Sequence, residues 1–126
     1  MTRQKMTPHQ FKERYKGKGW TGIALAQRWG KGREWISRIA NDIGRDVHWD
    51  DAVVGLPAYR DRSNATLSPD EFKAHYKGKG WTGLALAAHW DKGREWVSRV
   101  SNDANREQHW NDAVLGLPER SPGPNP

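Results

Sequence analysis

Apolar residues in the first part of the chain recur every three or four positions, which is the spacing of amphipathic helices. The positions that trace four short helices are Phe11 and Tyr15, then Leu25, Ala26 and Trp29, then Trp35, Ile36, Ile39, Ala40 and Ile43, and last Trp49, Ala52, Val53 and Leu56. The apolar and polar alternation of strands does not occur. The pattern therefore predicts an all-α fold.

Start and stop signals delimit these helices. Thr7 and Pro8 form a cap followed by a first-turn proline, and Thr21 can cap the second helix. The glycine-containing stretches 16–19 and 30–32 interrupt the helical pattern. We therefore expect a tight turn between the second and third helices.

The whole pattern occurs twice. Residues 8–57 align without a gap on residues 69–118, most positions are identical, and all eight tryptophans recur 61 positions apart. The buried face of the third helix in the second copy is expected to contain Trp96, Val97, Val100 and Ala104. The predicted division is a first module at 1–57 with a basic N-terminal arm (Arg3 and Lys5), a linker at 58–68, a second module at 69–118 and a disordered tail at 119–126.

Composition narrows the function. The 21 lysines and arginines against 15 acidic residues give a net charge of +6, which indicates a polyanionic partner. The lack of cysteine excludes disulfides and thiolate metal sites. No apolar stretch approaches the roughly 18 residues of a membrane span, and no signal-peptide pattern occurs. We expect a cytoplasmic protein that does not associate with membranes.

The polar face of the third helix is the same in both copies. Its members are Arg33, Glu34, Ser37, Arg38 and Asn41 in the first copy, and Arg94, Glu95, Ser98, Arg99 and Asn102 in the second. Exposed positions elsewhere have changed, as at Glu13, which is replaced by Ala74. The unchanged face favours a function over simple solvation. A recent duplication would leave the same identity.

The spacing of Ala26, Gly30, Ile36 and Ile39 resembles that of a helix-turn-helix motif, and the chain is similar to lambda-repressor and Cro-like DNA-binding domains. The segments TP-x-x-F and GWT-x-x-x-LA agree with that family's opening helix and second helix. The second copy repeats the spacing at Ala87, Asp91, Val97 and Val100. The resemblance implies two tandem four-helix helix-turn-helix modules joined by a short linker.

The resemblance implies that helices 33–41 and 94–102 enter successive major grooves of double-stranded DNA. The ten residues of the polar face are then candidates for reading bases, with arginine suited to guanine, asparagine to adenine and glutamate to cytosine. The candidates for phosphate contacts are Lys16, Lys18, Thr21 and Lys31 in the first copy and Lys77, Lys79, Thr82 and Lys92 in the second. Phosphate contacts position a protein but do not specify a sequence.

Two features set the copies apart from the family and from each other. Gly22 and Gly83 stand where the family often has a polar residue that reaches phosphate, and Asp91 replaces the turn glycine Gly30. The first copy has nine basic and six acidic residues, a balance of +3, whereas the second has seven of each, a balance of 0. We therefore expect the first copy to dominate affinity for DNA.

These observations predict a sequence-specific transcriptional regulator, most simply a repressor, of bacterial, phage or plasmid origin. One chain would act as a covalent pseudo-dimer on two similar half-sites, because an 11-residue linker spans at most about 36–40 Å and half-sites one turn apart are separated by roughly 34 Å. We expect a monomer or a weak homodimer. Direct and inverted half-sites both remain possible at this point.

Other functions are open to the same sequence. A protein-interaction module or antagonist could reuse the fold, with the near-neutral second copy binding protein. Architectural DNA binding would use the charge with little sequence reading. Double-stranded RNA is disfavoured, because its narrow major groove does not admit a helix.

His48 and His109 each lie three residues before an aspartate, Asp51 and Asp112, which raises the question of a metal or acid–base pair. No nucleophile or complete ligand set recurs at matching spacing. We expect packing or capping histidines, with no catalytic residues, no metal, no cofactor and no enzymatic activity.

Overall fold

A computed structural model describes residues 5–62 and 66–120, and these residues form helices and loops with no strand. The helices are α1 (Pro8–Gly17), α2 (Gly22–Arg28), α3 (Trp35–Asn41), α4 (Val47–Val54), the 3-10 helix η1 (Tyr59–Asp61), α5 (Pro69–Gly78), α6 (Gly83–His89), α7 (Arg94–Asn102) and α8 (Gln108–Leu115). The all-α prediction is confirmed. Arg3, most of the predicted tail and the centre of the predicted linker lie outside the described residues.

The opening helices begin where the caps were expected. Thr7 and Gln10 form a capping box at α1, in which each side chain bonds the backbone of the other residue. Ser68 and Glu71 do the same at α5. The Oγ1 atom of Thr21 accepts from the Ala24 N–H at 3.1 Å and caps α2. Local sequence signals therefore determine these boundaries.

The turn between α2 and α3 needs left-handed backbone. Gly30 supplies it with φ +69°, and its counterpart Asp91 adopts φ +57°. Aspartate tolerates this region better than most side chains, so the replacement preserves the turn. The α2–turn–α3 arrangement recurs as α6–turn–α7.

The third helix is shorter than its apolar pattern predicts. Ile43 is 76% exposed and Ala104 is exposed, although both were assigned to the buried face. The helix ends at Asn41 because Asp42 accepts the Gly44 N–H at 2.9 Å through Oδ1 and turns the chain. At the other end, Arg33 and Glu34 precede α3, whereas their counterparts lie within α7.

The helices of each copy pack against one another in the same way, and their buried apolar residues belong to one continuous core. α1 packs against α3 and α4, and α2 against α3, with the corresponding contacts among α5, α6, α7 and α8. In both copies a buried tryptophan in the loop before the second helix also bonds the end of the copy. The Nε1 atoms of Trp20 and Trp81 donate to the carbonyls of Pro57 and Pro118 at 2.8 and 2.9 Å. Among the described residues no helix has the length and apolar character needed to cross a membrane.

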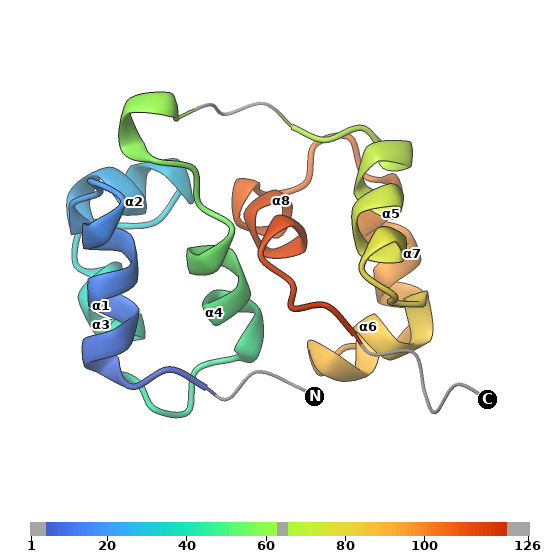
Figure 1. Cartoon of the computed structure of the whole chain (residues 1–126), viewed down its shortest axis with the longest axis horizontal. Coiled ribbons are helices and arrows are strands. Elements are labelled where there is room, and N and C mark those ends of the chain that lie inside the picture. The colour runs from blue at the N-terminus through green and yellow to red at the C-terminus, as the bar shows by residue number, and fades with distance from the viewer. Residues whose placement is uncertain (1–4, 63–65, 121–126) are drawn as a thin grey trace.

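The copies meet through α4 and α8, which pack against each other at the centre of the molecule. In Figure 1 α4 and α8 lie between α1, α2 and α3 on one side and α5, α6 and α7 on the other. α3 and α7 lie toward opposite ends of the long axis, beyond this central pair.

Candidate functional site

The ten residues predicted to read bases are all exposed. They lie on α3 and α7 or in the turns before them, and the buried sides of these helices are held by Ile36, Ala40, Val97 and Val100. Two equivalent polar surfaces result, one in each copy. We call them the α3 face (Arg33, Glu34, Ser37, Arg38, Asn41) and the α7 face (Arg94, Glu95, Ser98, Arg99, Asn102).

Two of the lysines predicted to contact phosphate are occupied elsewhere. The Lys18 ammonium donates to the carbonyls of Val54 and Leu56 at 2.6 and 2.7 Å, at the end of α4. Lys79 donates in the same way to Leu115 and Leu117. Burial, followed by the charge of Arg14, lowers the pKa of Lys18. Both ammonium groups satisfy free carbonyls at a helix terminus, and a phosphate contact by Lys18 or Lys79 stays a prediction.

The remaining phosphate candidates are placed in three ways. Lys16 and Lys77 are exposed near the ends of α1 and α5. The hydroxyls of Thr21 and Thr82 cap α2 and α6 and remain at the surface. Lys31 and Lys92 are half-buried over tryptophan rings, Lys31 at 5.5 Å from the ring centre of Trp35 and Lys92 at 5.5 Å from that of Trp96.

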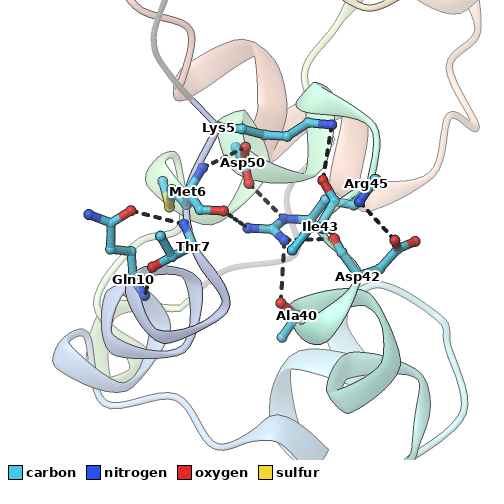
Figure 2. Close-up of polar contacts among 10 residues, drawn as sticks. Lys5, Met6, Thr7, Gln10, Ala40, Asp42, Ile43, Arg45 and Asp50 are labelled. Atoms are coloured by element: carbon cyan, nitrogen blue, oxygen red, sulfur yellow. Dashed lines mark hydrogen bonds and ion pairs between the residues drawn. The ribbon is translucent and has the colours of Figure 1, made fainter.

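A buried arginine braces the loop between α3 and α4. The Arg45 side chain is fully buried and its Nε lies 2.9 Å from Oδ1 of Asp50. The same guanidinium donates to the carbonyls of Met6 and Asp42 at 2.6 and 2.9 Å, and Figure 2 shows it pointing between these groups. The segment before α1, the end of α3 and the start of α4 are thereby joined, which fixes the position of the α3 face.

The contact between copies is reciprocal and polar at its edges. Asp112 on α8 accepts from Arg28 and from the Trp29 Nε1, both at 2.8 Å, so two residues at the end of α2 reach the other copy. Asp51 on α4 accepts from the Trp90 Nε1 at 2.8 Å and lies 2.8 Å from His89 Nε2.

Close backbone approach makes glycine necessary at the centre of this contact. A Cβ atom on Gly55 would lie 1.9 Å from the carbonyl oxygen of Asp112. A Cβ atom on Gly116 would lie 1.8 Å from that of Asp51. Real Cβ atoms never come this close, so α4 and α8 can cross as they do only because both positions lack a side chain.

In the contact between α4 and α8, the histidine of each copy packs against a tryptophan of the other copy. The ring centres of His48 and Trp110, and those of His109 and Trp49, are both 4.3 Å apart. Both His48 nitrogens have no hydrogen-bond partner among the described residues. Burial lowers the pKa of His48 to about 2 and that of His109 to about 3. Both histidines are therefore neutral packing residues, as the sequence predicts.

Sequence reasoning did not find the contact between copies. The available signal was Asp51 and Asp112, carboxylates that recur unchanged among apolar positions of the fourth helix. A carboxylate on a buried face requires a donor. The donors sit in α2 and α6, which no local pattern links to the fourth helix. In the described part of the chain, no cluster of three or more His, Asp or Glu side chains could hold a metal ion.

The chain matches no protein-family model, no curated protein and no solved structure. The two polar faces and the packing that holds them are therefore the features that bear on function. An open hollow beside the α7 face is lined by Arg94, Glu95 and Arg99.

Proposed function

We propose that the protein binds double-stranded DNA in a sequence-specific manner and regulates transcription by occupying an operator. The observation that carries the proposal is the pair of faces: the same five polar side chains are exposed at equivalent positions of the two copies, on α3 and the turn before it and on α7. A helix of this width fits the major groove, where arginine and asparagine discriminate bases. Repression is the simplest result of occupying a promoter.

The arrangement of the copies supports this proposal. α4 and α8 pack against each other, and Trp29 and Trp90 donate reciprocally to Asp112 and Asp51, so α3 and α7 hold equivalent places in a paired arrangement. Helix-turn-helix dimers present their recognition helices to DNA in this way. Here one chain supplies both helices, so that a second chain is not required.

The copies would contribute unequally. The first copy carries a balance of +3 and the second a balance of 0, and the turn before the α7 face contains Asp91 in place of glycine. Charge on the protein sets much of the affinity for the phosphate backbone. The first copy therefore supplies more of the binding energy, while both copies read bases.

One observation favours a different function, the binding of a protein partner. Ile23 is 51% exposed and its counterpart Leu84 is 66% exposed, so both copies expose a large aliphatic side chain at the start of the second helix. Scattered exposed aliphatic residues are common on soluble domains. Their recurrence at equivalent positions nevertheless makes protein binding the second candidate.

The experiment is selection of binding sites from a random duplex library with the full chain at two salt concentrations. We expect an enriched sequence motif with two similar halves. Weak retention that falls steeply with salt and enriches no motif would indicate nonspecific attraction. That result would overturn the proposal and favour the protein partner.

Matched variants test the assignment of residues. Arg38→Ala is expected to relax the preference at one base position and to weaken the best site by about tenfold. Arg60→Ala removes the same charge from an exposed side chain in η1, away from both faces, and serves as the control. Lys16→Ala is expected to weaken all sequences alike and to reduce the salt dependence by about one ion. Equal effects of Arg38→Ala and Arg60→Ala would contradict the assignment.

A further inference from the structure

We infer that the DNA site is an inverted repeat with one fixed spacing, and that the α4–α8 contact, not the linker, sets this spacing. The inference rests on the proposed function and names the kind of DNA that it requires. It concerns the orientation of two half-sites read by a single chain, which the repeated sequence leaves open.

Orientation follows from reciprocity. The Trp29 Nε1 donates to Asp112 at 2.8 Å, and its counterpart Trp90 donates to Asp51 at 2.8 Å. Each copy thus gives the other the bond that it receives, which is the property of a two-fold contact. Copies that read direct repeats would be related by translation along the DNA. A contact between copies related in that way joins two different surfaces, so it is not reciprocal.

A two-fold arrangement reads the two DNA strands in opposite directions. Because the α3 and α7 faces carry identical side chains, each should prefer the same half-site sequence. The duplex backbone has two-fold axes of its own, and aligning one of them with the axis between α4 and α8 places both faces equivalently. The matching site is an inverted repeat.

The spacing is fixed because α4 and α8 cannot slide past each other. Gly55 and Gly116 approach the opposite helix so closely that neither has room for a methyl group. The Arg28 guanidinium also holds Asp112 through two bonds, at 2.8 and 2.9 Å. A shift along the helices would break these bonds and bring backbone atoms into collision.

The linker is tied to its own copies at both ends. The Tyr59 N–H donates to the Lys18 carbonyl at 2.7 Å, and the Tyr59 ring packs edge-on against Trp20 at 5.1 Å. At the other end, the Leu67 carbonyl accepts from Arg106. The linker therefore connects two copies whose relative position is already determined. This replaces the expectation that its extended length sets the distance between half-sites.

The test measures affinity of the full chain for duplexes that carry the selected half-site once, as a direct repeat, or as an inverted repeat with the centre spacing varied one base pair at a time. We expect one inverted spacing to bind about a hundredfold tighter than the single half-site, because the second contact is intramolecular. Direct repeats should bind no tighter than a single half-site.

A second measurement separates the contact from the linker. A short Gly-Ser insertion between Arg62 and Thr66 is expected to leave the preferred spacing unchanged. Broadening of the preference by the insertion, or equal affinity for direct and inverted repeats, would overturn the inference while the proposed function stands. If the chain binds no duplex with sequence preference, the proposed function fails and the inference fails with it.

Discussion

The equivalent arginines Arg45 and Arg106 are buried at the same place in the two copies, but their acidic environments differ. Arg45 pairs with the carboxylate of Asp50 at 2.9 Å. Arg106 bonds the amide oxygen of Asn111 at 2.8 Å, and burial lowers its pKa. Each guanidinium also donates to a carbonyl that lies shortly before the first helix of its copy and to a carbonyl of the third helix. These carbonyls therefore hold the arginine in place in both copies, and the carboxylate adds stability without being required.

The contact between copies has a similar asymmetry. Arg28 holds Asp112 with two bonds, whereas its counterpart His89 approaches Asp51 with one nitrogen. The tryptophan bond is the same on both sides. A two-fold contact thus survives replacement of one of its edge residues, because its centre is formed by glycines and by aromatic packing.

The largest effect is expected from Gly55→Ala. The new methyl group would collide with the Asp112 carbonyl at 1.9 Å, and backbone cannot move aside as a flexible side chain can. We expect a loss of about 4 kcal/mol or more in the free energy of unfolding, measured by urea denaturation.

Gly17→Ala is the matched control for this variant. Gly17 is the last residue of α1, and a Cβ atom there meets nothing within 4 Å. Alanine favours helix over glycine by about 1 kcal/mol, so this change should be neutral or stabilising. If Gly55→Ala were equally mild, the close crossing of α4 and α8 would be wrong.

The next largest effect is expected from Asp50→Asn, which gives the first copy the side chain of the second. The change leaves the buried Arg45 charge without its carboxylate and weakens the bond from the Met6 N–H. Breaking a buried ion pair costs about 3 kcal/mol. The loss in the free energy of unfolding is measured by urea denaturation. A loss below about 1 kcal/mol would mean that the backbone carbonyls alone stabilise the guanidinium.

Most of the helices, and the exposure of the α3 and α7 faces, could be predicted from the sequence. Caps such as Thr7 and Ser68, and the left-handed turn at Gly30, are local signals that tertiary structure did not override. Ile43 was misplaced because helical periodicity says nothing about Asp42, which ends the helix before that residue is reached.

The rest of the site could not be read from local patterns. Lys18 looks like a phosphate ligand beside glycine, yet it binds carbonyls 36 and 38 residues away. The pairing of α4 with α8 depends on Asp51 and Asp112 finding donors in the opposite copy. Spacing along one copy cannot distinguish such a partner from a partner within the copy.

A smaller effect, shared by both copies, is expected from acid. The pKa of His48 is lowered from 6.5 to about 2 and that of His109 from 6.5 to about 3, so the folded protein keeps both neutral while the unfolded chain protonates them. Their contribution to stability is complete above about pH 6.5 and is lost as the pH falls. Each should contribute a slope of about 1.4 kcal/mol per pH unit below the unfolded pKa.

Chemical denaturation between pH 6 and 5 measures this slope, above the range where most carboxylates protonate. His48→Phe retains an aromatic ring and should remove the part of the pH slope that His48 contributes. The control His9→Gln changes an exposed histidine and should leave the slope unaltered. An unchanged slope in His48→Phe would show that the contact admits water and protons at these rings.

The smallest effect is the reverse exchange, Asn111→Asp, which gives the second copy the carboxylate of the first. The Asn111 Nδ2 has no hydrogen-bond partner among the described residues, and Arg106 is buried beside it. A carboxylate would remove this unpartnered donor and supply the missing charge, so a gain of about 1 kcal/mol is expected in urea denaturation. Arg106→Lys in the same background should abolish the gain, since one ammonium cannot replace the several bonds of the guanidinium. A loss of stability in Asn111→Asp would mean that the second copy has adjusted to a neutral partner, and that the two arginine sites are no longer interchangeable.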